Sequence, residues 1–160
     1  KSSLINALTG RNKLARASTE PGRTRELNFF RMGDRLRLVD LPGYGYAKAP
    51  KNEIGRWTTL TRDYLRGRPT LYRVLLLIDS RHGLKPDDKA VMDALDTSAV
   101  IYQLVLTKAD KIKPTELADT LTATQAAIVK RPAAHPVVIA TSSETSLGIA
   151  ELRAEIAALA

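Results

Sequence analysis

The sequence predicts an α/β fold with a mostly parallel sheet, because short apolar runs alternate along the chain with segments of helical spacing. The run at residues 74–78, Val-Leu-Leu-Leu-Ile, is unbroken and is typical of a strand buried on both faces. Residues 100–106 form a second buried run. The chain has 160 residues, about the size of one domain, and we expect a single domain over residues 1–160.

The first expected elements are a helix, a hairpin and a second helix. An amphipathic helix begins at the pair Lys1-Ser2. Residues 26–32 and 35–40 predict two antiparallel strands around the turn Gly33-Asp34, because the second run alternates basic and apolar side chains. Residues 52–66 carry apolar side chains at helical spacing, so Trp57 in this segment is interpreted as a packing residue.

Strands and helices then alternate to the end of the chain. The expected order is a strand at residues 73–79, a helix at 87–95 behind Pro86, a strand at 100–106, a helix at 114–129 with Pro114 in its first turn, a short strand at 136–140 and a helix at 149–159. Asp87 and Asp88 stand at a helix start and are interpreted as caps that complement the helix dipole.

Composition excludes several classes of function. Cysteine is absent, so thiol catalysis, zinc–thiolate sites and disulfide frameworks are excluded. No apolar run reaches the roughly 18–20 residues of a membrane span, and we expect no membrane partner. Residues 1–89 hold 19 Lys and Arg against 9 Asp and Glu, whereas residues 90–160 hold 6 against 8. The basic half indicates either a polyanionic partner or a solvated surface, and composition leaves both open.

Polar clusters follow each expected strand, where open α/β sheets bind their ligands. These clusters are Asp40-Leu41-Pro42-Gly43, Asp79, Thr107-Lys108-Ala109-Asp110 and Thr141-Ser142-Ser143. The sequence therefore predicts a binding site at the carboxyl edge of the sheet.

Two of the motifs fit a phosphate and its metal. Lys1-Ser2 heads a helix as in the end of a phosphate-binding loop, where the lysine reaches the β- and γ-phosphates and the serine hydroxyl ligates Mg²⁺. In the D-x-x-G motif that Asp40 begins, the carboxylate can hold a Mg²⁺-bound water and the Gly43 amide can donate to a γ-phosphate. Taken singly, the first is better explained as an arbitrary terminus and the second as an ordinary turn after a strand.

The T-K-x-D motif, which runs from Thr107 to Asp110 and includes Lys108, is the most informative piece of sequence. It resembles the guanine-specificity motif, since a carboxylate can accept two hydrogen bonds from the guanine N1 and N2 groups, and adenine lacks that pair of donors. The stem of Lys108 can cover the face of the base. Backbone amides near Ser142 can meet the guanine O6. The alternative is a loop lysine and a helix-capping aspartate.

The four motifs stand in the order that a guanine-nucleotide domain requires, and longer stretches extend the match. The segments that carry it are Pro21-Gly22-Arg23-Thr24, Asn28-Phe29-Phe30, Leu38-Val39-Asp40-Leu41-Pro42-Gly43-Tyr44-Gly45-Tyr46, Asp79-Ser80-Arg81-His82, Leu106-Thr107-Lys108-Ala109-Asp110-Lys111 and Ser142-Ser143. With them the chain resembles the EngB (YihA/YsxC) family, within the TrmE-Era-EngA-EngB-septin group of P-loop GTPases.

The resemblance implies a three-layer, Ras-like P-loop GTPase domain. It also implies that the chain is an N-terminally incomplete record of a longer protein, lacking its first strand and most of its phosphate loop. In such a domain that strand lies between the strand that ends at Asp40 and the strand that ends at Asp79. In potassium-stimulated relatives an asparagine of the phosphate loop helps to hold a monovalent cation, so K⁺ is a second cofactor that the resemblance raises beside Mg²⁺.

The resemblance also implies a role for each motif residue. The nucleotide-binding residues are Lys1, Ser2, Gly22, Arg23, Thr24, Arg25, Glu26, Asp40, Leu41, Pro42, Gly43, Thr107, Lys108, Ala109, Asp110, Thr141, Ser142 and Ser143. Ser2 and Thr24 are the expected Mg²⁺ ligands. Lys1, Thr24 and Gly43 are the expected catalytic residues. Tyr44 stands where Ras-like GTPases place the glutamine that orients water, so we expect slow hydrolysis without a partner.

The implied function is a cytoplasmic, monomeric GTP switch with weak Mg²⁺-dependent hydrolysis. It would act on the large ribosomal subunit and its RNA, in assembly of that subunit and in cell division and septation. Arg11, Lys13 and Arg16 are either RNA contacts or solvated charge. Two alternatives stay open: a basic RNA-binding module without active hydrolysis, and another small GTPase of the same superfamily. Whether this chain by itself is active also stays open.

Overall fold

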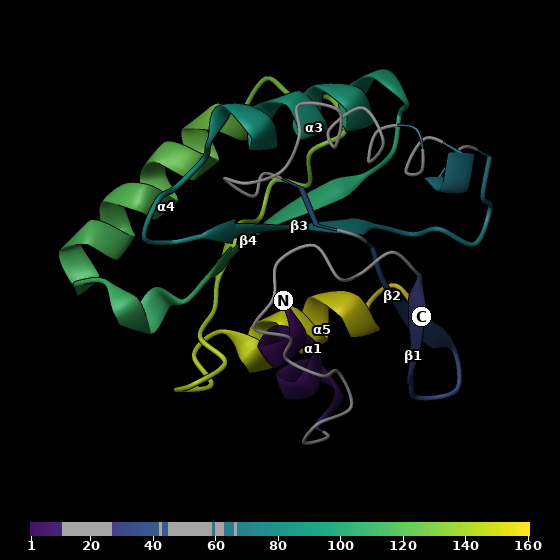
Figure 1. The fold of residues 1–160 in the computed structure, drawn as a ribbon, viewed down its shortest axis with the longest axis horizontal. Helices are drawn as coiled ribbons and strands as arrows, with labels where there is room; N and C mark the ends of the chain where they lie inside the picture. The colour runs from purple at the N-terminus through teal and green to yellow at the C-terminus, as the bar shows by residue number, and fades with distance from the viewer. Residues whose placement is uncertain (11–26, 42, 45–58, 60–62, 66) are drawn as a thin grey trace.

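Three parallel strands form the centre of the protein, for which we have a computed structural model (Figure 1). The structure describes residues 1–10, 27–41, 43–44, 59, 63–65 and 67–160. The strands are β3 (Val74–Asp79), β4 (Tyr102–Thr107) and β5 (Ile139–Ala140), in the order β3-β4-β5. Asp79 lies opposite Thr107 in the register, so β3 and β4 end level with each other.

A two-stranded sheet lies beside this centre. β1 (Asn28–Met32) pairs antiparallel with β2 (Leu36–Asp40), from Asn28 opposite Asp40 to Met32 opposite Leu36. Gly33 has φ 61°, which allows the tight turn between them. Among the described residues no strand joins β2 to β3.

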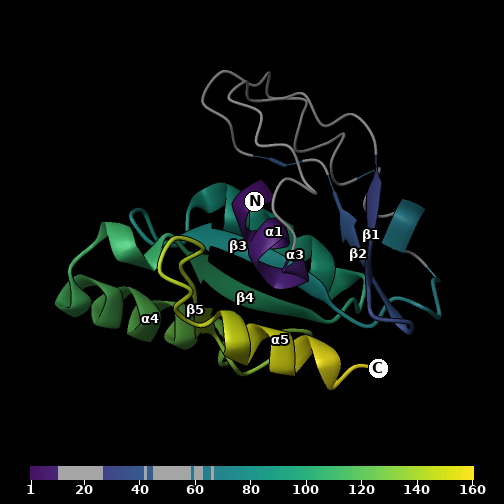
Figure 2. The same cartoon turned by 90° about the horizontal axis from the view of Figure 1, so that it is seen from below.

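Helices cover both faces of the parallel sheet and give three layers (Figures 1 and 2). α3 (Pro86–Thr97) and α4 (Pro114–Ile128) lie on one face, and α1 (Ser2–Thr9) and α5 (Ile149–Ala157) on the other. Alternate β3 residues point to the first face, where Leu76 and Ile78 pack with Met92 of α3. Val105 of β4 points to the second face and packs with Leu152 of α5.

Local signals fix the ends of the helices. Asp88, three residues into α3, accepts a hydrogen bond from the Lys85 amide at 2.8 Å, which confirms its reading as a cap. Glu116 does the same for α4, with the Lys113 amide at 2.9 Å. α1 ends at Gly10 in the left-handed region, φ 66°. Arg153 of α5 donates to the carbonyls of Ala7 and Leu8, in the last turn of α1.

The expected elements are confirmed where the structure describes them, with two differences in detail. β3 is not fully buried on both faces: Val74, Leu76 and Ile78 are buried, but Leu75 and Leu77 are half-buried. Leu75 and Leu77 pack against the apolar cluster of α1 and α5 but are only partly buried by it. β5 has two residues rather than five. Most of the expected helix at 52–66, with Trp57, lies outside the described residues. None of the helices in the described ranges is long and apolar enough to span a membrane.

Candidate functional site

The carboxyl edge of the parallel sheet gathers most of the predicted site residues that the structure describes. The Ser80 amide donates to the Thr107 carbonyl at 2.9 Å, and the Thr107 hydroxyl donates to the Ile78 carbonyl at 3.3 Å. The Ala109 amide donates to the Thr141 carbonyl at 3.0 Å. These bonds hold the loops after β3, β4 and β5 side by side, so the T-K-x-D and Ser-Ser motifs meet as the sequence predicts.

Asp110 is held by the loop that follows β5. The Ser142 hydroxyl donates to Asp110 Oδ1 at 2.7 Å and itself accepts from the Thr145 amide at 3.1 Å. Lys111 Nζ lies 3.2 Å from Asp110 Oδ2. The Ser142 hydrogen bond, with a smaller contribution from Lys111, holds the pKa of the Asp110 carboxyl below its usual value. The carboxylate therefore stays ionised near neutral pH and can only accept hydrogen bonds.

Thr141 and Ser142 are both buried, and their backbone is fixed from two sides. The Thr141 amide and hydroxyl both donate to the Leu106 carbonyl, at 2.7 and 2.8 Å. The Ser142 amide donates to the Leu147 carbonyl at 3.0 Å. Because Ser142 is buried and its backbone is held in place, its hydroxyl is a well-positioned donor to Asp110.

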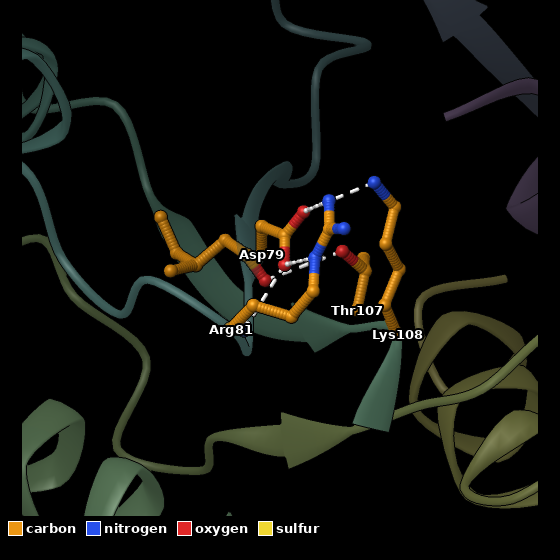
Figure 3. A network of polar contacts seen from close by, with 5 residues as sticks. Asp79, Arg81, Thr107 and Lys108 are labelled. Atoms are coloured by element: carbon orange, nitrogen blue, oxygen red, sulfur yellow. Dashed lines mark hydrogen bonds and ion pairs between the residues drawn. The ribbon is translucent and has the colours of Figure 1, made fainter. Parts of the chain in front are cut away.

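Lys108 turns back across the sheet edge toward β3 (Figure 3). Its backbone is in the left-handed region, with φ 58° and ψ 36°. Its ammonium donates to Asp79 Oδ2 at 3.0 Å. Asp79 also accepts three hydrogen bonds from Arg81. The sequence analysis placed Asp79 at the binding edge of the sheet but gave it no individual role. The signal was present in the segment Asp79-Ser80-Arg81, directly after a strand.

Lys1 and Asp40 form a second cluster, near the amino end of α1. Lys1 Nζ lies 2.7 Å from Asp40 Oδ1 and donates to the Leu41 carbonyl at 2.6 Å. The Asp40 side chain is only 9% exposed, and its Oδ1 accepts no well-aligned hydrogen bond despite the ion pair. Ser2 opens α1 beside this pair. A lysine at a helix amino end suits a phosphate, and a hydroxyl beside a carboxylate suits a hard cation such as Mg²⁺.

The contacts of Tyr44 are those of a packing residue. Its hydroxyl donates to Asp88 Oδ1 of α3 at 2.9 Å, and its ring packs on the core beneath α3. Burial, and then the Asp88 charge, raise the pKa of the Tyr44 phenol far above its ordinary value. The protonated phenol is therefore a fixed donor to α3 and not a base. The sequence analysis assigned Asp88 to the cap alone and missed this second contact.

Several predicted site residues lie outside the described residues. These are Gly22, Arg23, Thr24, Arg25, Glu26 and Pro42, together with the basic residues Arg11, Lys13 and Arg16. In the part of the chain that is described, no group of three or more His, Asp or Glu side chains could hold a metal ion. A site that uses hydroxyls and phosphate oxygens remains compatible with this finding.

Comparison with known proteins identifies the family. The family model described as 50S ribosome-binding GTPase matches residues 1–108. The chain is 59% identical to the probable GTP-binding protein EngB of Rhodospirillum rubrum, over all of this chain and 71% of that protein. It is 60% identical to the protein of the same name from Bradyrhizobium diazoefficiens, over 99% of this chain and 74% of that one.

Solved structures show the same fold. The chain matches Era in complex with MgGDPNP and nucleotides 1506–1542 of 16S ribosomal RNA, with a TM-score of 0.69 and 21% identity over 97% of this chain and 51% of Era. It matches the elongation factor SelB of Methanococcus maripaludis with a TM-score of 0.64 and 19% identity, over 99% of this chain and 30% of that one. With this fold and with relatives at nearly 60% identity, the chain belongs to the EngB family of GTP-binding proteins, among the P-loop GTPases.

Proposed function

We propose that this protein is a guanine-nucleotide switch with slow Mg²⁺-dependent GTP hydrolysis that acts in assembly of the large ribosomal subunit. The observation that carries the nucleotide part is the Asp110 carboxylate, ionised and held by Ser142 at the carboxyl edge of the sheet. The family name supports GTP as the ligand, and the printed description of the family model supports the ribosome as the partner.

Base recognition follows from the chemistry of Asp110. An ionised carboxylate has two acceptor oxygens and no donor, which matches the guanine N1–H and N2–H groups. Adenine offers an acceptor at N1, so it would leave the carboxylate unpaired and repelled. Thr107, Lys108 and Ala109 shape the approach to the base, and Thr141, Ser142 and Ser143 form its other wall.

Lys1 and Ser2 would bind the phosphates and Mg²⁺. The ammonium of Lys1 supplies positive charge at the amino end of α1, where backbone amides also favour an anion. Ser2 and Thr24 would ligate the Mg²⁺, with Asp40 able to hold one of its waters. When bound, the metal would neutralise charge that develops on the phosphate oxygens.

Slow hydrolysis follows from the residues after Asp40. The Gly43 amide can donate to the γ-phosphate, but the next side chain, Tyr44, donates to Asp88 instead of orienting water. Lys1, Gly43 and Thr24 would therefore stabilise the transferring phosphoryl group without a general base. K⁺ is a further activating ion under this proposal.

The proposal places the protein in the cytoplasm as a single-domain monomer over residues 1–160, with a role in septation. The resemblance to the EngB family supports these points. The excess of Lys and Arg in residues 1–89 suits a surface of ribosomal RNA. Gly22, Arg23, Arg25 and Glu26 would belong to the first switch and Leu41 and Pro42 to the second, so nucleotide exchange would alter this same half of the chain.

Asp110→Asn tests the nucleotide part. The amide lacks one acceptor, so GDP binding should weaken by about 1–3 kcal/mol. Xanthosine diphosphate should bind better than it does to the unaltered protein, because its extra carbonyl accepts from the new amide. The matched control is Asp119→Asn, on the exposed surface of α4. Calorimetric titration with both nucleotides decides the matter, and GDP affinity equal in both variants would contradict the role of Asp110.

A further inference from the structure

One carboxylate at the sheet edge binds two cations. Asp79 Oδ1 accepts hydrogen bonds from the Arg81 amide and Nε, each at 3.0 Å. Asp79 Oδ2 accepts from Arg81 Nη2 at 2.8 Å and from Lys108 Nζ at 3.0 Å. Figure 3 shows the side chains of Arg81 and Lys108 converging on Asp79.

We propose that Asp79 is a positioning residue for guanine-nucleotide binding, acting through Lys108. By holding the ammonium of Lys108, it fixes the lysine stem along the sheet edge, where the stem is ready to cover the face of the base. The inference rests on the proposed function, because it needs Lys108 to be part of the guanine site.

The backbone makes this contact specific. Asp79 and Thr107 are register partners at the ends of β3 and β4, so Lys108 begins one residue beyond Asp79. The left-handed backbone of Lys108 then turns its side chain off the direction of β4. Since the strand ends are hydrogen-bonded through Ser80 and Thr107, the backbone positions of Asp79 and Lys108 are held close together in the fold.

Arg81 completes the arrangement by orienting the carboxylate. Its guanidinium binds both oxygens of Asp79 in a bidentate geometry, which fixes the carboxylate plane and leaves part of Oδ2 for Lys108. The Arg81 hydrogen bonds, with a smaller contribution from Lys108, hold the pKa of Asp79 far below its usual range. The carboxylate therefore remains charged at every pH at which the protein is expected to work.

Positioning matters because a lysine side chain has many rotamers. The Lys108 side chain is 51% exposed, so packing alone restricts it less than it would a buried side chain. A free lysine would lose rotamer freedom on binding the base, whereas the ion pair with Asp79 has already restricted it. Without Asp79, Lys108 and Arg81 would also repel each other.

A double-mutant cycle tests the proposal by GDP affinity. Asp79→Asn should weaken GDP binding about two- to tenfold, the cost of ordering one long side chain. In a Lys108→Met background the same change should have less than a twofold effect, because the side chain that Asp79 positions is gone. Asp79→Glu keeps the charge and should recover part of the affinity. Asp93→Asn is the matched control, since Asp93 lies on α3 and pairs with Arg131, which follows α4, and its loss should leave GDP affinity unchanged.

The outcomes separate this inference from the proposed function. If Lys108→Met weakens GDP binding but Asp79→Asn does not, the positioning role is wrong and the guanine site stands. Equal losses from Asp79→Asn in both backgrounds mean that Asp79 supports the loop and not Lys108, which also overturns the role. If neither Lys108→Met nor Asp110→Asn weakens GDP binding, the proposed function itself fails. Thermal unfolding of each variant shows whether a loss of GDP affinity comes from unfolding. Where Asp79→Asn folds poorly, Asp79→Glu takes its place in the comparison.

Discussion

Replacing Gly148 with alanine should destabilise the protein and disturb the loop that holds Asp110. Gly148 precedes α5 with φ +68°, and a Cβ built there would lie 2.0 Å from the Ala140 carbonyl oxygen. A Cβ essentially never lies within 3.0 Å of a non-bonded heavy atom elsewhere in the chain, so the two backbone segments must separate by at least 1.0 Å. Ala140 leads directly into Thr141 and Ser142, so this displacement falls on the loop that holds Asp110.

The size of the effect has two parts. A left-handed conformation costs an alanine about 1–2 kcal/mol relative to its usual backbone. Forcing atoms into a filled space typically costs a further 1–3 kcal/mol or so. A 1 Å separation is also large compared with the roughly 0.5 Å range of good N–H···O distances. The bonds from Ser142 to Leu147 and from Leu152 to Gly148, both 3.0 Å, are therefore expected to weaken.

Gly33→Ala is the matched control. Gly33 has φ +61°, but a Cβ there would meet nothing within 4 Å, so this variant carries the backbone cost without the clash. With a urea slope of about 2 kcal/mol per molar, the clash should lower the unfolding midpoint of Gly148→Ala by a further 0.5–1.5 M or so. GDP affinity should fall in Gly148→Ala and not in Gly33→Ala. Equal midpoints and equal affinities for the two variants would refute the reasoning.

Two further predictions concern other parts of the molecule. Tyr44→Phe removes the donor to Asp88 and should lower the free energy of unfolding by about 1–3 kcal/mol. Tyr72→Phe, at an exposed tyrosine, should leave it unchanged. A urea titration that gives the same midpoint for both variants contradicts the Tyr44 contact. Binding to large ribosomal subunits should weaken with salt and differ between GDP and a non-hydrolysable GTP analogue, because phosphate contacts release counterions and the nucleotide alters the basic half; co-sedimentation that is indifferent to both is the opposing result.

The elements that could be predicted are those with local signals. Pro86 and Pro114 mark the starts of α3 and α4, and Gly33 marks the turn of the hairpin. The burial of β3 was predicted wrongly, because an apolar run shows that a strand can be buried but not what covers each face. β5 is short for a related reason: pairing with β4 limits it to two residues, opposite Val105 and Leu106.

The residues of the candidate site also differ in how far the sequence could predict them. T-K-x-D and Ser-Ser could be found because each motif is contiguous, and their contact follows from the expected strand order. Asp79 could not be paired with Lys108 in this way, since the two are 29 residues apart and the strand register brings them together. Tyr44 and Asp88 are 44 residues apart and meet through tertiary packing alone. Sequence patterns thus locate the candidate groups, while the partners that orient them depend on the assembled sheet.

The distribution of charge at the sheet edge gives Asp79 a second consequence. Lys108 pairs with Asp79, whereas Asp110 pairs with Lys111 and accepts from Ser142. Opposite charges a few Å apart attract strongly at a partly desolvated surface, so a Lys108 without Asp79 would have Asp110, two residues away, as its alternative partner. A carboxylate oxygen occupied by an ammonium is a poorer acceptor for the base. Pairing Lys108 with Asp79 therefore leaves Asp110 with one neighbouring ammonium, that of Lys111, instead of two. Under the proposed function, the same charge that orders Lys108 would then also keep it from competing with guanine for Asp110.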